Sequence, residues 1–404
     1  MTLTSVGTRS VPTLDVDPFD ATSLADPDPM HAVLRDAGPL VYLPRYDVYA
    51  MARYAQVHAA LVDWQRFRSG AGVGLLNFRF DEPWRKPSVL LETDPPWHDA
   101  PRRVLSAILA PHAVRRLREE WLATARRLVD EVLAEDEFDA VTAFAEELPL
   151  RVFPAAVGLA PESDWRRLLA YGDHMTNAFG PRNRLVLAGE AEAPANAAWV
   201  DDRCARDVLA PDGFGARTFE AAERGEITAE QAPMVVRSLL SAGVDTIVQG
   251  LAWTLHLLAT HPAQWARLRR EPGLARVAFD EAIRWATPVQ TFFRTAATDV
   301  TVEPGLVVPD GKKILMFLGG ANRDPRHWPD ADSYDLGRDP SGHVGFGFGI
   351  HQCVGQHIAR LEAEALLTAL VERVETLAPA AEPIRHLNNT LRAWGSLPMR
   401  VRRG

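Results

Sequence analysis

A glycine-rich loop that delivers a cysteine to the start of a long helix is the feature that most restricts how this chain can fold. Residues 346–355 read FGFGIHQCVG, and the segment QHIARLEAEALLTALVERV that follows has the spacing of a helix. Backbone N–H groups at a helix start favour negative charge, so Cys353 is placed to act as a thiolate and to bind a soft or borderline metal. Gly347 and Gly349 allow the backbone to approach a flat, bulky group. The alternative is a buried structural cysteine beside a turn.

Composition narrows the class of protein. The chain has 404 residues, of which 47% are hydrophobic and 24% charged, so disorder is excluded as its main state. Its 53 acidic residues exceed the 44 basic ones, which argues against nucleic acid or an anionic membrane as the main partner. The sequence has neither a signal-like start nor an apolar run of about 18 residues, so we expect a cytoplasmic protein without a membrane span. Cys204 and Cys353 lie far apart in sequence, so no disulfide is expected.

Hydrophobic spacing indicates a mainly α-helical fold with small β-sheets. Amphipathic helical pattern dominates residues 101–374, and the first helix is expected around Met30. Strand-like runs occur at LVYLP and YDVYAMAR, in DVTVEPGLVVPDGKKILMFLG, and in LPMRVRR near the C-terminus. No repeat and no Ser/Gly linker is present, so residues 1–15 are expected to form an irregular lead-in and residues 16–404 a single domain.

The segment MVVRSLLSAGVDTIVQGLAWTLHLLA is apolar on nearly every side, as expected of a helix that crosses the centre of a protein. Gly243, Asp245 and Thr246 interrupt it, at a cost in stability. The Thr246 hydroxyl can donate to the carbonyl of Ala242 one turn back, which opens a groove in the helix beside an acid. The residues alone allow either a functional site or a glycine-kinked core helix.

The spacing of the cysteine loop, F-G-x-G-x-H-x-C-x-G, resembles the haem-binding signature of the cytochrome P450 family. This resemblance implies the P450 fold, a large helical domain with a smaller β-rich region, and a b-type haem. It implies that Cys353 is the proximal thiolate ligand, which favours O–O cleavage. It also places three further loop residues at the haem, namely Phe346, Gly347 and Gly355.

Three other segments carry the same resemblance in the same order. A-G-V-D-T at residues 242–246 is similar to the family's acid and alcohol pair, so Asp245 and Thr246 are expected to relay protons during dioxygen activation; Ile247 stands where a second threonine is common. In EAIRWATPVQTFFRTA, Glu281 and Arg284 resemble the E-x-x-R scaffold. Arg338, in the loop before the cysteine, would complete that scaffold. The residues expected at the haem propionates are His98, Arg102, Arg294 and His351.

The loops resemble more closely the bacterial branch that O-demethylates 4-methoxybenzoate and oxidises related para-substituted benzoates. The segments concerned are KPSVLLETDPP, NAFGPRN, RSLLSAG, TPVQTFFR, SGHVGFG and NNTLR. Arg85 offers a planar bidentate fork that, with Ser88, Ser238 and Ser241, would hold one carboxylate. Apolar walls for a benzene ring are expected from Leu91, Phe179, Ala242, Val289, Phe292 and Leu391. Thr176, where an aromatic residue could stand, would widen the pocket.

The leading hypothesis is a haem-thiolate monooxygenase that inserts one atom of O2 into the methyl C–H bond of a methoxybenzoate, giving a hemiacetal that loses formaldehyde. Electrons would come from an iron–sulfur ferredoxin and an NAD(P)H-dependent ferredoxin reductase, with a basic docking patch near Arg102 and Arg103. One alternative is an O-demethylase of neutral lignin-derived methoxyphenols of the 4-alkylguaiacol type. Others are a haem-thiolate peroxygenase and a haem sensor or ligand binder without catalysis, against which the pair Asp245–Thr246 argues.

Overall fold

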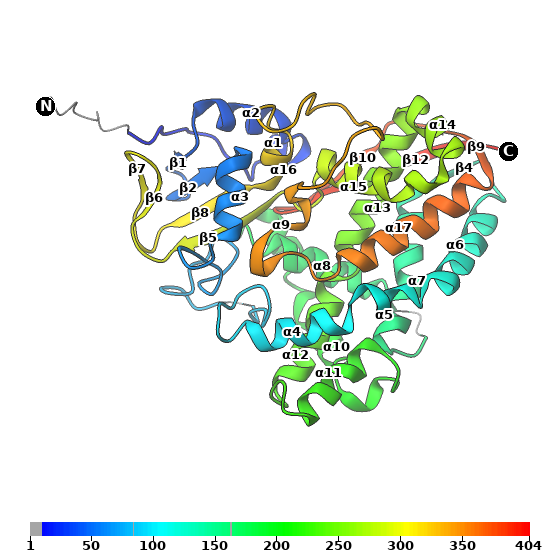
Figure 1. The fold of residues 1–404 in the computed structure, drawn as a ribbon, viewed down its shortest axis with the longest axis horizontal. Helices are drawn as coiled ribbons and strands as arrows, with labels where there is room; N and C mark the ends of the chain where they lie inside the picture. Colours follow the sequence, from blue (N-terminus) through cyan, green and yellow to red (C-terminus); the bar gives the residue numbers. More distant parts are fainter. Residues whose placement is uncertain (1–9, 84, 162–163) are drawn as a thin grey trace, which may run out of the picture.

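The computed structural model describes residues 10–83, 85–161 and 164–404. Helices dominate the described part of the chain, and small sheets lie at both ends of the molecule's long axis (Figure 1). The mainly α prediction is therefore confirmed. The helices are α1 (Ala21–Ala25), α2 (Asp28–Ala37), α3 (Tyr54–Val62), α4 (Asp99–Ile108), α5 (Pro111–Arg115), α6 (Arg118–Val132), α7 (Glu147–Val157), α8 (Arg167–Asn177), α9 (Arg184–Gly189), α10 (Ala193–Asp202), α11 (Phe214–Glu223), α12 (Gln231–Ala242), α13 (Asp245–Thr260), α14 (Pro262–Arg270), α15 (Ala275–Ala286), α16 (Leu318–Asn322) and α17 (Gln356–Val371).

The largest sheet of the described residues has the strand order β1-β2-β8-β5-β3, with β2 and β8 parallel and the other pairs antiparallel. A second sheet has the order β4-β12-β9, and β6-β7 and β10-β11 are two-stranded. The expected strand-like runs all form strands. The strands are β1 (Val41–Leu43), β2 (Val48–Met51), β3 (Phe67–Arg68), β4 (Glu137–Asp139), β5 (Thr291–Ala296), β6 (Val300–Glu303), β7 (Leu306–Val308), β8 (Lys313–Phe317), β9 (Val374–Pro379), β10 (Ile384–Leu387), β11 (Arg392–Ser396) and β12 (Pro398–Arg403).

The N-terminal region is more ordered than its sequence predicts. Residues 1–9 of the expected lead-in lie outside the described residues, but Thr13 forms a parallel bridge to Tyr42. Helix also begins earlier than Met30, because Asp20 caps α1 by accepting hydrogen bonds from the backbone N–H groups of Thr22 and Ser23. Side-chain capping made a short helix where the apolar pattern gave no signal.

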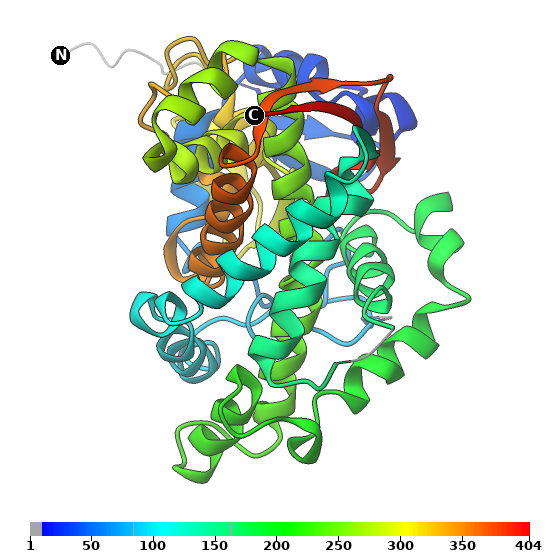
Figure 2. The same cartoon turned by 90° about the vertical axis from the view of Figure 1, so that its right-hand side faces the viewer.

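The helical core is built around α13, which packs against α15, while α17 packs against both α15 and α6. Figure 2 shows α6, in cyan, running alongside α17, in orange. The main hydrophobic cluster includes fully buried side chains from all four helices, among them Trp121, Trp253, Phe279 and Leu366. The stretch Gln231–Thr260 is long and apolar enough to cross a membrane, but 67% of its most apolar window is buried inside the protein. It is therefore a core segment of the fold.

Candidate active site

The shape of the cysteine loop depends on two positions that only a glycine can occupy without strain. The backbone N–H of Cys353 donates to the carbonyl of Phe346 at 2.8 Å, which closes the loop just before α17. Gly347 and Gly349 have φ values of +67° and +69°, a left-handed conformation that L side chains rarely adopt. A Cβ on Gly349 would lie 2.6 Å from the carbonyl oxygen of Leu61. The loop therefore presses against α3 with no room for a side chain.

The environment of the Cys353 thiol differs from the expected one. Burial raises the pKa of Cys353, and the backbone N–H groups of Gly355 and Gln356 and the charge of Arg102 lower it by less. The helix start alone therefore does not produce a thiolate, because desolvation outweighs it. A metal ion bound at the sulfur would deprotonate the thiol. The two N–H groups are placed to donate hydrogen bonds to the resulting thiolate.

A largely apolar cavity separates the cysteine loop from the break between α12 and α13. Leu105, Phe279 and Ile358 contribute apolar wall, and Arg102 and Arg294 also line it. Cys353, Phe346, Gly347, His351 and Gly355 form one side, and Ala242, Gly243 and Thr246 form part of another. The cavity thus offers a slot with a sulfur ligand on one side and the broken helix on the other.

One edge of this slot carries cationic and imidazole groups, and of their acidic neighbours in the described part of the chain only Asp99 approaches closely, at 3.4 Å from His98 Nδ1. The rings of His98 and His351 lie 4.6 Å apart. His98 Nε2 and both ring nitrogens of His351 are buried and lack hydrogen-bond partners among the described residues. Asp94 is 3.9 Å from His351 Nε2, too far for a hydrogen bond. Arg294 is buried, and desolvation lowers its pKa to about 10.

These groups fit a b-type haem. Cys353 would ligate the iron, the apolar slot would hold the macrocycle, and the arginine and histidine side chains at its edge would bind the two propionates. His98, Arg102, Arg294 and His351 supply the required positive charge and donors at one edge. Burial lowers the pKa of His351 to about 4, so propionate charge beside it would favour a donating ring.

The interrupted central helix has the local geometry expected from its sequence. Thr246 Oγ1 donates to the carbonyl of Ala242 at 2.8 Å, and the helix restarts at Asp245. A Cβ on Gly243 would lie 2.4 Å from the ring of Phe153, so close packing requires this glycine. Asp245 Oδ2 is buried and has no hydrogen-bond partner among the described residues. Burial, followed by the charge of Asp173, raises the pKa of Asp245 to about 7.

The three residues expected to form a scaffold lie together in the core. Arg284 Nε and Nη2 donate to both oxygens of Glu281, at 2.7 and 2.8 Å, and both side chains are fully buried. Arg338 Nε donates to Glu281 Oε1 at 3.1 Å. Arg284 also donates to the carbonyls of Asn322, Ala331 and Ser333. This cluster ties α15 to the loop that precedes the cysteine.

The structure brings together most of the residues expected at the substrate. Those that line the cavity are Ser88, Leu91, Ser238, Ser241, Ala242, Val289 and Phe292. Arg85, Phe179 and Leu391 are not among its lining residues. Phe179 lies behind Phe292, with ring centroids 5.9 Å apart, and Leu391 bridges Val289 as a β-partner. These two residues therefore support the wall from behind.

Arg85 is engaged by a carboxylate that the sequence analysis did not single out. Arg85 Nη1 donates to Glu92 Oε2 at 2.7 Å, Nη2 pairs with Oε1, and the Glu92 side chain is fully buried. Glu92 also accepts from the backbone N–H groups of Ser88 and Val73. The guanidinium of Arg85 lies 4.8 Å from the Phe179 ring centroid. The sequence did contain a sign of this pair, because Glu92 in LLETDPP stands only seven positions after Arg85.

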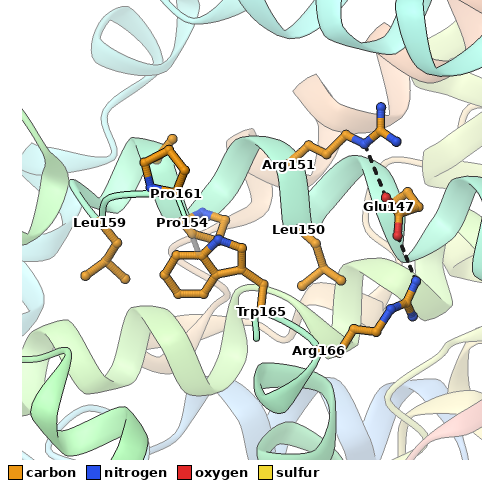
Figure 3. A pocket seen from close by; sticks show the side chains of 9 residues that line it. Glu147, Leu150, Arg151, Pro154, Leu159, Pro161, Trp165 and Arg166 are labelled. Atoms are coloured by element: carbon orange, nitrogen blue, oxygen red, sulfur yellow. Dashed lines mark hydrogen bonds and ion pairs between the residues drawn. The ribbon is translucent and has the colours of Figure 1, made fainter. Parts of the chain in front are cut away.

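A second cavity lies beside α7 and is lined by Leu150, Pro154, Trp165 and the charged residues Glu147, Arg151 and Arg166 (Figure 3). Glu147 accepts from Arg151 Nε at 3.2 Å and from Arg166 Nη2 at 2.7 Å. Arg151 pairs in addition with Glu131, and Arg166 with Glu146. Its charges are thus satisfied internally, unlike those at the edge of the cysteine cavity.

Comparison with known proteins agrees with this site. Residues 212–400 match the family model described as Cytochrome P450. The chain is 49% identical to cytochrome P450 CYP199A2 from Rhodopseudomonas palustris over 392 residues, covering 97% of this chain and 95% of that protein. It is 30% identical to the cytochrome P450 monooxygenase PikC from Streptomyces venezuelae, covering 98% and 96% of the two chains.

Solved structures show the same architecture. The crystal structure of CalO2 superposes with a TM-score of 0.84 at 26% identity, over 96% of this chain and 98% of that one. CYP109Q5 from Chondromyces apiculatus gives a TM-score of 0.79 at 26% identity, over 96% and 99%. With a cysteine placed to ligate iron and a cavity shaped for the macrocycle, the chain belongs to the cytochrome P450 family and is a haem-thiolate monooxygenase.

Proposed function

We propose that this monooxygenase oxidises small aromatic carboxylic acids, with O-demethylation of para-substituted benzoates such as 4-methoxybenzoate as its main reaction. The observation that carries the proposal is that three hydroxyl side chains, Ser88, Ser238 and Ser241, line a largely apolar cavity. Glu92, which accepts from the Ser88 N–H, holds Arg85 next to this lining. The benzoate-type resemblance of these loops and the 49% identity to CYP199A2 support it.

Charge at this end of the cavity favours an anion. Arg237 donates to the carbonyl of Pro87, next to Ser88, and Lys313 lies behind it on β8, near Glu92 and Arg85. Burial lowers the pKa of Lys313 to about 7, so Lys313 is partly charged near neutral pH. Arg85, Arg237 and the partly charged Lys313 lie near the buried carboxylate of Glu92, whereas the nearby acids Asp81 and Asp201 are exposed to solvent. We expect a buried substrate carboxylate to be stabilised by these cations.

Each lining residue then has a defined task. The serine hydroxyls orient the substrate carboxylate, and Leu91, Val289 and Phe292 pack against the ring. The para substituent points toward the centre of the slot, beside Ala242 and Thr246. Bound haem supplies the oxidising chemistry, by which one atom of O2 enters the methyl C–H bond and the other leaves as water. The product hemiacetal releases formaldehyde and the phenol.

Within this mechanism, Asp245 and Thr246 hold and move protons. Thr246 is oriented by its bond to the Ala242 carbonyl, and the Asp245 carboxyl titrates near pH 7, which suits a group that gives up and regains a proton. Two electrons per turnover come from NAD(P)H through a reductase and an iron–sulfur ferredoxin. We propose these electron donors, and a cytoplasmic location, for this enzyme.

Binding measurements with matched ligands test the substrate class. Arg85→Ala is expected to weaken 4-methoxybenzoate binding by roughly tenfold to a hundredfold, because it removes a buried positive charge near the serines that would hold the substrate carboxylate. Binding of neutral 4-methoxytoluene should hardly change. The measurement is the haem spin-state shift on titration with each ligand.

Arg85→Ala also leaves Glu92 buried without its partner, so a second variant separates the two effects. Glu92→Gln keeps the guanidinium and removes the competing carboxylate, and is expected to bind 4-methoxybenzoate at least as tightly as the native enzyme. If Arg85→Ala remains folded but weakens the binding of the acid and of the neutral ligand equally, Arg85 has no role in carboxylate recognition.

One observation favours a second candidate function. Because Glu92 already neutralises Arg85, the cavity could serve neutral methoxyphenols of the 4-alkylguaiacol type. In that case 4-alkyl-2-methoxyphenols give larger spin-state shifts than any benzoate, and Arg85→Ala has no selective effect. Turnover that requires the electron donors, and not peroxide alone, distinguishes either function from a peroxygenase.

A further inference from the structure

The acid of the central helix packs against α8, the helix that carries part of a polar cluster. Asp245 packs directly against α8, since a Cβ on Gly172 would lie 2.7 Å from Asp245 Cβ and 3.4 Å from Oδ2. Only a glycine leaves room for the carboxyl here. The neighbouring residue along α8 is Asp173, whose charge acts on Asp245.

Asp173 is held in a network that reaches the surface. His386 Nε2 lies 2.7 Å from Asp173 Oδ1, and the His386 side chain is 49% exposed. Asn388 Nδ2 donates to Asp173 Oδ1 at 2.8 Å and Asn177 Nδ2 donates to Oδ2 at 3.1 Å. Asn388 also donates to Thr176 Oγ1 at 3.0 Å. The β10–β11 hairpin thereby fixes a titratable pair against the back of Asp245.

We propose that Asp173 and His386 are positioning residues that connect Asp245 to solvent and set its protonation state. The inference rests on the proposed proton-handling role of Asp245. Asp245 releases one proton toward the cavity in each cycle, and one proton from bulk water enters on the exposed His386 side to replace it. No electrons move in this exchange, and no further reactant is needed.

The charges around Asp245 act in opposite directions. Burial raises its pKa most, Asp173 and Glu146 raise it further, and His386 lowers it. The hydrogen bond to Asp173 raises the pKa of His386, so the imidazolium persists to higher pH than in a free histidine. In the intact pair, the positive charge of His386 therefore opposes the increase in the pKa of Asp245 that Asp173 causes. Loss of either member should therefore move the Asp245 titration in a direction set by its charge.

Infrared titration of the substrate-free, haem-loaded enzyme tests this directly. The Asp245 carboxyl band is assigned by its loss in Asp245→Asn. His386→Gln is expected to raise the pKa of Asp245, because it removes a positive charge, and Asp173→Asn to lower it. The exposed residue His112, on α5, supplies the matched control His112→Gln, which should leave the band unchanged. Shifts of the same sign in both variants, or no shift in either, overturn the inference.

Measuring product formed per NAD(P)H distinguishes a failure of this inference from a failure of the proposed function. His386→Gln is expected to reduce product formed per NAD(P)H and to increase the solvent isotope effect, while substrate-induced spin-state shifts stay native. If Asp245→Asn leaves coupling unchanged, the role of Asp245 itself is wrong. If Asp245→Asn uncouples the enzyme but neither His386→Gln nor Asp173→Asn moves the infrared titration, only the solvent connection is wrong.

Discussion

Cys353 and the two glycines before it show how single residues decide what this loop can hold. Gly347 and Gly349 supply left-handed backbone conformations, and the loop closes by the bond from Cys353 to Phe346. The other cysteine, Cys204, is buried, and burial raises its pKa to about 12. Its Sγ donates to the carbonyl of Val200 at 3.2 Å. A thiol in that setting is a packing group rather than a ligand.

Cys353→Ala is therefore expected to abolish haem-thiolate ligation. The reduced carbon monoxide complex should lose its red-shifted Soret band, because no other thiol lines the cavity. Cys204→Ala is the matched control and should retain the band. Loss of the band in Cys204→Ala and its retention in Cys353→Ala would reverse the ligand assignment.

Thr246→Ala should divert electrons from product to peroxide. The hydroxyl that is anchored on the Ala242 carbonyl is the cavity-facing partner of Asp245, so its loss removes the organised path for the proton. Substrate binding, measured by spin-state shift, is expected to stay close to native. Unchanged product per reducing equivalent counts against this role.

At the level of elements, the break between α12 and α13 and the anchoring of α15 hold the cavity open. The chain gives up regular helix at Gly243 because Phe153 occupies the space of a side chain there. Glu281 and Arg284 stand one turn apart on α15, where an exposed pair would contribute only about 0.2–0.5 kcal/mol. Buried and hydrogen-bonded to three backbone carbonyls, Arg284 instead fixes the loop before the cysteine.

Glu281→Ala should destabilise the fold by about 3–5 kcal/mol, because it leaves the Arg284 charge buried without its partner. Chemical unfolding of the haem-loaded enzyme measures the change. The exposed pair of Arg166 with Glu147 provides the comparison, since Arg166→Ala should cost no more than about 1 kcal/mol. Similar losses in the two variants would mean that the buried cluster is not a scaffold.

At the level of the whole molecule, the haem-facing and surface-facing sides of α4 serve different purposes. Arg102 lines the cavity, whereas Arg103, one residue further along α4, is exposed, as is the indole of Trp97 just before the helix. We propose this exposed face of α4 as the place where the ferredoxin would dock.

Arg103→Glu is expected to weaken ferredoxin-supported turnover several-fold, with an effect that shrinks as salt rises, since it reverses a charge at an electrostatically steered interface. Substrate spin-state shifts and turnover with a peroxide should not change. Arg127→Glu, on the exposed face of α6, is the control. Equal losses in both variants would show a general charge effect instead of a docking site.

The sequence determined those features that depend on local backbone and on helix spacing. The glycines, the cysteine and the start of α17 lie within 11 consecutive residues, 346–356, so their conformation is set by nearby chain. The Thr246 bond to Ala242 is one helical turn long and was predicted from spacing alone. The early start of helix at α1 was missed because a side-chain cap, and no apolar repeat, produces it.

Only the tertiary structure decided which side chains meet across long separations. His386 lies 213 positions from Asp173, yet the β10–β11 hairpin brings the two into hydrogen-bond contact behind Asp245. Arg85 was expected to face the cavity, but burial of Glu92 draws the guanidinium into a pair behind the wall. Likewise the Cys353 thiol is governed by desolvation more than by its helix start. In the last two cases burial sets the free energy of the charge, and in the first the fold brings distant residues together; no local sequence pattern records either property of the folded chain.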